Sequence, residues 1–268
     1  MSQVPIKVSE RIINGIKKFQ PILAQAKTKD INEADTVILI TDMLSEIFGY
    51  DKYSEVTSEF AVKKSYCDLA IKLNNKLRLL LEIKAIGIEL KDYHIQQAVD
   101  YGANAGVEWV LLTNGHIWKI FKIIFAKPIE KELIYHFDLL QTNPKNHKEL
   151  EQIYFLSKEG MSKQSLDDFL IQKETLSKFF LGQIILNETI IESIKKILRK
   201  VSPDVRLETD EIRSVISNDI IKRDVLEGPK AQEAHKKLTK IMNPPQRKAL
   251  PVELEPPKIT VSVEGERE

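Results

Sequence analysis

Two short apolar segments separated by a polar turn constrain this chain more than any other part of its sequence. The segments read YCDLAIKL and LRLLLEIKA, and Asn74, Asn75 and Lys76 lie between them, which predicts two antiparallel strands joined as a hairpin. Each strand carries one carboxylate, Asp68 or Glu82, at a position where a core strand would carry an apolar residue. If the loop consists of those three polar residues, Asp68 lies directly opposite Glu82.

The carboxylates of this hairpin are expected to lie close to a cation. Directly opposed residues have Cβ atoms about 4.5–5.5 Å apart, and two carboxylates that close repel unless a cation sits between them. Alternation along the strand puts Lys84 on the same face as Glu82, and the apolar surroundings make an unpaired charge unfavourable. Asp68, Glu82 and Lys84 therefore predict half of a divalent metal site with a lysine beside it. The alternative is a salt bridge on an exposed sheet face.

The rest of the first half alternates helical and strand patterns. Apolar periodicity predicts helices over 6–27, bent or interrupted near Pro21, and from Glu33 to about residue 48. Strands are expected over 53–62, in the hairpin, and over 108–112, 116–125 and 133–137, with a helix over 88–106 between them. This order of elements predicts an α/β domain with one central sheet, covering residues 1–145.

Strand patterns are absent from the sequence after the polar segment 141–148. Helices are expected over 162–171, 174–201, 209–226 and 231–242. The apolar stripe of the long helix 174–201 suits an interface, either onto the first domain or in a homodimer. We therefore predict a helical domain over 146–242, for an interface or DNA binding, and a disordered proline-rich tail over 243–268.

Composition excludes several classes of protein. The 268 residues carry a net charge of +1 and 43% hydrophobic residues, so any nucleic-acid surface must be a local patch. Cys67 is the only cysteine, which excludes an intrachain disulfide and favours a cytoplasmic protein. No apolar run is long enough to span a bilayer, no signal peptide is recognisable, and no P-loop motif of an ATP motor is present.

The residues of the hairpin are the parts that phosphodiester hydrolysis needs. Mg²⁺ is held by one or two carboxylates with waters completing its shell, and it activates water and neutralises phosphate charge. A neighbouring lysine can stabilise the charged transition state or help to deprotonate the water. A further acid could come from the preceding helix, where Glu33 is the candidate and Asp35 its competitor. The alternative for Glu33 is a first-turn acid that complements the helix dipole.

The helix over 88–106 carries further candidates. Gln97 and Tyr101 are four residues apart and so share a face, with His94 three residues before Gln97. That face could look toward the metal site while Ile95 and Val99 pack on the sheet. The alternative is an ordinary solvated face, and His94 alone is more simply a surface histidine.

Taken together, these residues resemble the PD-(D/E)xK nuclease superfamily, and more narrowly the N-terminal nuclease domain of type I restriction enzyme R subunits. The resemblance rests on Glu33, on YCDLAI with Asp68, on LLLEIKA with Glu82 and Lys84, and on Gln97 with Tyr101; EWVLLTNGHIW also resembles the group. It covers about residues 6–137. It implies a restriction-endonuclease-like central mixed sheet flanked by helices, and Mg²⁺- or Mn²⁺-dependent cleavage of DNA.

By this resemblance Glu33, Asp68 and Glu82 are the metal-linked acids and Lys84 is the catalytic lysine. Gln97 and Tyr101 would support DNA binding or nucleolysis. Two features depart from the family: Cys67 stands where the superfamily has proline, and the motor of an R subunit is missing. We therefore expect a stand-alone nuclease, a homodimer, or one directed by a targeting partner subunit.

Two other functions stay open from the sequence. The chain could be a non-catalytic nucleic-acid-binding or assembly module that keeps a nuclease-like fold, or a nuclease directed at RNA. Lys63, Lys64 and Lys91 flank the expected site and could contact phosphates, although each taken singly is more simply a solvated loop lysine. The bases of a recognition sequence cannot be read from these residues.

Overall fold

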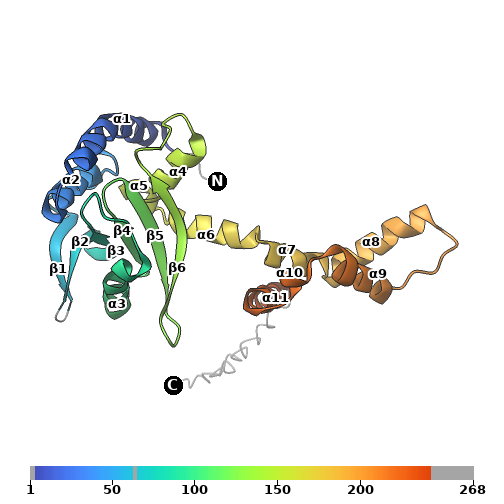
Figure 1. The fold of residues 1–268 in the computed structure, drawn as a ribbon. Coiled ribbons are helices and arrows are strands. Elements are labelled where there is room, and N and C mark those ends of the chain that lie inside the picture. The colour runs from blue at the N-terminus through green and yellow to red at the C-terminus, as the bar shows by residue number, and fades with distance from the viewer. Residues whose placement is uncertain (1–3, 63–64, 243–268) are drawn as a thin grey trace, which may run out of the picture. The chain divides into compact units, whose positions relative to one another are not determined.

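The computed structural model describes residues 4–62 and 65–242, and its contacts divide the chain into two compact units, 1–173 and 174–268 (Figure 1). The predicted disordered tail over 243–268 and the lysines Lys63 and Lys64 lie outside the described residues. No helix in the described part of the chain is both long and apolar enough to cross a membrane.

Unit 1 is an α/β domain built on one mixed sheet, as the sequence predicts. The six strands are β1 (Val56–Val62), β2 (Ser65–Leu73), β3 (Lys76–Ile83), β4 (Trp109–Thr113), β5 (Ile117–Ile124) and β6 (Glu130–Asp138). They lie side by side in chain order, and only β3 and β4 pair in parallel. The helices before and within the sheet are α1 (Ile6–Lys29), α2 (Glu33–Glu46), the 3₁₀ turn η1 (Asp92–Ile95) and α3 (Gln96–Ala105).

The helices cover the two faces of the sheet with two separate cores. One core joins α1 and α2 to the face that carries Leu79, Leu81 and Ile83 of β3. The other joins α3 to the opposite face, which carries Leu80. Because successive strand residues alternate between faces, Glu82 and Lys84 belong to the side covered by α3.

The β2–β3 hairpin differs from its prediction in the turn but agrees in the register. The loop has two residues, Asn74 and Asn75, both with positive φ (51° and 60°), which is the backbone of a type I′ turn. A bulge between Ile71 and Lys72 then shifts the pairing by one residue, so that Leu69 lies opposite Leu81. One further step of this register places Asp68 opposite Glu82, as predicted from a three-residue loop without a bulge.

The first two helices bring the polar end of α2 toward this hairpin. Helix α1 continues through Pro21, where the sequence predicts a bend or an interruption, so it is not interrupted there, and its buried residues recur along one face. Helix α2 begins at Glu33, as predicted, because Asn32 caps it by accepting a hydrogen bond from the Asp35 amide at 2.9 Å. Gly49 follows α2 with φ of 81°, the left-handed conformation that commonly ends helices.

Unit 1 extends beyond the predicted boundary at residue 145. It also contains α4 (His147–Phe155), α5 (Lys158–Ser162) and most of α6 (Ser165–Thr175). Arg11 of α1 donates two hydrogen bonds to Glu159 of α5, both 2.7 Å, and the buried Tyr50 hydroxyl donates to the Leu156 carbonyl at 2.7 Å. These contacts hold the short helices on the first domain, although the intervening segment reads as a polar linker.

Unit 2 is helical in its described part, as predicted, but its long helix is not continuous. It contains α7 (Lys178–Ile185), α8 (Glu188–Val201), α9 (Thr209–Val215), the π turn η2 (Ile216–Ile220), α10 (Arg223–Leu226) and α11 (Pro229–Met242). The predicted helix over 174–201 is broken twice, because Ser177 and Asn187 act as N-caps of α7 and α8. A small core of Ile191, Ile212 and Ile216 joins α8, α9 and η2.

Candidate catalytic site

The end of β3 brings two of the predicted acids into contact with the predicted lysine. The ammonium of Lys84 donates a hydrogen bond to Glu82 Oε1 at 2.8 Å and forms an ion pair with Glu33 Oε2 at 3.7 Å. Glu33 reaches this point from the first turn of α2. The charge of Lys84 therefore joins a strand acid and a helix acid that are 49 positions apart in the sequence.

Asp68 completes the group from the neighbouring strand. Its Oδ2 accepts a hydrogen bond from the Ile83 amide at 2.6 Å, which orients the carboxylate toward the end of β3. The charges of both Lys84 and Glu33 act on Asp68. The structure thus brings Glu33, Asp68, Glu82 and Lys84 together, whereas the backbone amide of Asp35 donates to the Asn32 cap of α2.

Glu82 is the most deeply placed of these acids. Its residue is 5% exposed, and its Oε2 atom is buried without a hydrogen-bond partner among the described residues. Burial, followed by the neighbouring charges of Asp68 and Glu33, raises the pKa of Glu82 against the opposing effect of Lys84. Burial is also the main cause that raises the pKa of Asp68. In both acids burial disfavours the charged form of the carboxyl group.

The pKa of Lys84 is raised as well, which for a lysine favours the charged form. Burial acts to lower the pKa of Lys84, but the hydrogen bond that Lys84 donates to Glu82 and the charges of Glu82, Glu33 and Asp68 together raise it above its ordinary value. Lys84 is therefore a protonated ammonium at neutral pH in this arrangement. In that state it can donate hydrogen bonds to an anion, and it cannot accept a proton from water.

The acids do not by themselves form a compact metal cage. Within residues 4–62 and 65–242, no group of three or more histidine, cysteine or acidic side chains is arranged to hold a metal ion. Mg²⁺ does not require such a cage, since one or two carboxylates with waters are sufficient. Glu82 and Asp68 are the two acids that could hold such an ion, and Glu82 Oε2 has no hydrogen-bond partner among the described residues.

The residues predicted on the following helix lie in different environments. Tyr101 is 3% exposed and belongs to the core between α3 and the sheet, together with Ile95 and Val99. Gln97 is exposed. His94, which the sequence suggests is a surface residue, is half-buried, and its pKa is lowered first by burial and then by the charges of Lys84 and Lys91. It therefore lies near the acid–lysine group.

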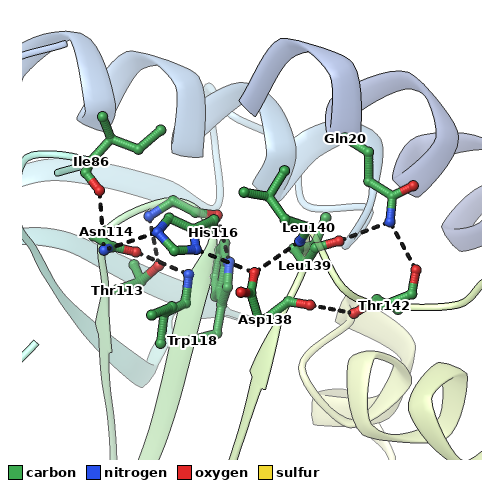
Figure 2. A network of polar contacts seen from close by, with 12 residues as sticks. Gln20, Ile86, Thr113, Asn114, His116, Trp118, Asp138, Leu139, Leu140 and Thr142 are labelled. Atoms are coloured by element: carbon green, nitrogen blue, oxygen red, sulfur yellow. Dashed lines mark hydrogen bonds and ion pairs between the residues drawn. The ribbon is translucent and has the colours of Figure 1, made fainter. Parts of the chain in front are cut away.

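A buried polar network that sequence reasoning missed supports the segment after β3 (Figure 2). The Asn114 side chain donates to the carbonyls of Ile86 at 3.2 Å and Ile88 at 3.0 Å, and accepts from the Ile117 amide at 2.9 Å. The Lys84 amide donates to the Thr113 carbonyl at 2.9 Å. The sequence signal was Asn114-Gly115, which predicts a turn but not that the turn side chain holds another loop.

The same network continues away from Asn114 to the end of β6. His116 Nδ1 lies 3.2 Å from Asp138 Oδ1, and Asp138 also accepts from the Leu140 amide at 2.9 Å. Gln20 of α1 donates to the carbonyls of Leu139 and Thr142, at 2.9 and 2.8 Å (Figure 2). These bonds connect α1 with the start of β5 and the end of β6, at the end of the sheet where Lys84 follows β3.

The fold and site together define an α/β domain with an acid–lysine group at the end of a central strand, supported by the first turn of a preceding helix. Residues 38–133 match the family model described as "Type I restriction enzyme R protein N terminus (HSDR_N)", which confirms the predicted resemblance for this segment. The match contains Asp68, Glu82, Lys84, Gln97 and Tyr101, and begins after Glu33. Comparison with curated proteins gives no significant match, and neither does comparison with solved structures.

Proposed function

We propose that this chain is a metal-dependent endonuclease that hydrolyses DNA phosphodiester bonds, in restriction or defence against foreign DNA. One observation carries the proposal: the buried, unpartnered oxygen of Glu82 lies on a side chain that is bonded to the Lys84 ammonium. A carboxylate in that position is unfavourable in a purely structural role. The match of residues 38–133 to the family of type I restriction enzyme R protein N termini also supports a role in restriction.

Asp68 and Glu82 would hold Mg²⁺ or Mn²⁺, with Glu33 as a further acid beside them. When bound, such a cation supplies charge neutralisation at the phosphate and a lower pKa for a bound water. The support for this assignment is the Glu82 Oε2 atom, which is buried without a hydrogen-bond partner among the described residues.

In this proposal Lys84 stabilises charge. Its protonated ammonium would donate a hydrogen bond to a phosphate oxygen as negative charge develops there. Glu82 and Glu33 position the ammonium at 2.8 and 3.7 Å, and raise the pKa of Lys84 against the effect of burial. A role as general base is the less suitable assignment, because the lysine would first have to lose its proton.

The second candidate is a non-catalytic nucleic-acid-binding or assembly module. It is favoured by one observation, since the described acids form no cluster of three or more suited to a metal, and Lys84 already neutralises part of their charge. Under that reading the acid–lysine group would be an ion-pair network that stabilises the end of β3.

Cleavage assays with plasmid, linear duplex and single-stranded DNA separate the two candidates. We expect wild-type chain to cleave DNA with Mg²⁺ or Mn²⁺ and not with EDTA. Asp68→Asn, Glu82→Gln and Lys84→Ala should each lower the rate by about 100-fold or more, the scale for removing a transition-state-stabilising group. Glu130→Gln, at an exposed acid of β6, is the matched control. Undiminished cleavage by all three site variants would overturn the site assignment, and no cleavage under any condition would favour the binding module.

We also propose that unit 2 serves assembly, as a homodimer contact or as a contact with a targeting subunit. Within α8, Ile197 is 62% and Val201 is 75% exposed, and apolar residues at helical spacing that are left open to solvent suit a partner surface. Sedimentation of wild type and of Ile197→Asp would test this proposal. A monomeric wild type would exclude the homodimer.

A further inference from the structure

A short turn next to the acid–lysine group presents an aromatic ring to solvent. The turn is η1, and its first residues are fixed by the Lys91 amide, which donates to His94 Nδ1 at 3.1 Å. Ile95 is fully buried and anchors the end of the turn in the core beneath α3. The sheet register pairs Glu82 with Leu112 and Leu112 with Lys119, and Lys119 bonds to the Leu90 carbonyl just before the turn, so the turn lies near the candidate catalytic site.

Two lysines from the sheet support the backbone of this turn. Lys119 of β5 donates a hydrogen bond to the Leu90 carbonyl at 2.7 Å, and Lys131 of β6 donates to the Asp92 carbonyl at 2.8 Å. Each bond fixes a loop carbonyl to a regular strand. Each lysine also brings a positive charge to the turn that it holds, which itself carries the exposed acid Asp92.

Tyr93 stands at the centre of this turn. It is 68% exposed, and its ring makes an edge contact with His94, with ring centroids 4.2 Å apart. A single exposed aromatic residue is ordinary on a protein surface. Tyr93 differs because its backbone is braced by Lys131 and its ring is held by His94, next to a group of acids and a lysine that suit phosphodiester chemistry.

We propose that Tyr93 is a stacking platform for an unpaired base, so that the preferred substrate is DNA with a single-stranded segment at the cleavage site. This inference rests on the proposed nuclease function and adds the substrate class to it. Bases within a duplex are stacked on each other and offer no free face, whereas the bases of single strands stack readily on exposed aromatic side chains. Cations such as Lys91, Lys119 and Lys131 would attract the phosphates beside that base.

The direct test measures stacking on a 15-nucleotide DNA strand that carries one 2-aminopurine, whose fluorescence falls when the base stacks. Full-length chain carrying Glu82→Gln would be used, so that binding is measured without turnover. Tyr93→Ala in that background should weaken binding of the single strand by about five- to a hundredfold, the range for loss of one base–aromatic contact, and abolish the quenching. Tyr93→Phe should retain both.

The matched control is Tyr53→Ala. Tyr53 is 88% exposed and lies beside Lys52, whose ammonium is 5.5 Å from the ring, but it follows the far end of α2, roughly 20 Å along the helix from Glu33. We expect Tyr53→Ala to bind and quench like its parent. Binding of a blunt duplex should be weaker than binding of the single strand, and unaffected by Tyr93→Ala.

Equal binding and equal quenching by parent and Tyr93→Ala would overturn the inference, as would an equal loss of single-strand and duplex binding. The outcome is separable from the nuclease proposal. If wild type cleaves DNA while Tyr93→Ala stacks like its parent, the platform is wrong and the nuclease stands. If Tyr93→Ala alone loses quenching while wild type cleaves nothing, the stacking role of Tyr93 is supported and the chain is a DNA-binding protein without nuclease activity.

Discussion

Replacing Lys84 by methionine should show how much the ion pair between Lys84 and Glu82 contributes to the free energy of unfolding. Methionine retains most of the aliphatic side chain but removes the ammonium, so Glu82 loses its hydrogen-bonded partner at 2.8 Å. Removing one partner of a fully buried ion pair destabilises a protein by about 3–5 kcal/mol. The side chains of Lys84 and Glu82 are 21% and 6% exposed, so part of the loss is relieved by solvent. We expect the free energy of unfolding to fall by about 2–3 kcal/mol at pH 7.

The dependence of this loss on pH follows from the direction of the Glu82 shift. Burial already raises the pKa of Glu82 above its ordinary value of 4.5, and Lys84 opposes that increase, so Lys84→Met should raise the pKa further. Between 4.5 and the raised folded-state pKa, the folded protein binds more protons than the unfolded chain, and stability therefore increases as the pH falls. The deficit of Lys84→Met should shrink by about 1 kcal/mol or more between pH 7 and pH 5.

Urea titrations followed by tryptophan fluorescence measure this change in unit 1 alone, because the two tryptophans of the chain, Trp109 and Trp118, both lie there. The double variant Glu82→Gln/Lys84→Met should be more stable at pH 7 than Lys84→Met. Lys52→Met is the control, since Lys52 and Asp42 form an exposed pair at 3.4 Å that should contribute about 1 kcal/mol or less. Wild-type stability of Lys84→Met at both pH values would refute the reasoning.

Three further outcomes test the surrounding structure. Asn114→Ala should lower the free energy of unfolding by about 2–3 kcal/mol, because three hydrogen bonds to the buried turn are lost; an unchanged urea midpoint would contradict the network. Cys67 should not react with Ellman's reagent at pH 8 until the chain unfolds, since burial raises the pKa of its thiol to about 12; rapid reaction of native protein would contradict the pairing of β2 with β3. Burial lowers the pKa of His116 below 6.5 against the effect of Asp138, so stability should fall as the pH drops below about 6.5 and His116→Gln should flatten that decline; parallel curves for the two proteins would exclude His116 as the titrating group.

The strands and the acid–lysine group were predictable because their signals are local. Alternation along β3 places Glu82 and Lys84 on one face, and the hairpin sequence determines which residue of β2 faces them. The prediction assumed a three-residue loop, and the structure reaches the same register through a two-residue loop and the bulge at Ile71. Asp68 lies opposite Glu82 in the predicted and in the observed hairpin, because the bulge compensates for the shorter loop.

Features that depend on distant contacts could not be read from the sequence. The boundary expected at residue 145 lies within unit 1, where Arg11 bonds to Glu159. The sequence around Glu159 gives no sign that its partner is Arg11. Asn187 ends the predicted long helix by capping α8, although the apolar spacing in the sequence continues past it. His94 looked like a surface residue because its proximity to Lys84 arises only when η1 packs against β4, the strand next to β3.

The most direct test of the central claim is a calorimetric titration of Mn²⁺ into wild type, Asp68→Asn, Glu82→Gln and the control Glu130→Gln. If the opposed strand acids form a cation site, wild type and the control should bind roughly one ion per chain saturably, and the two site variants should lose that binding. Equal binding by all four proteins, or no saturable binding by wild type, would contradict a metal site at the end of β3.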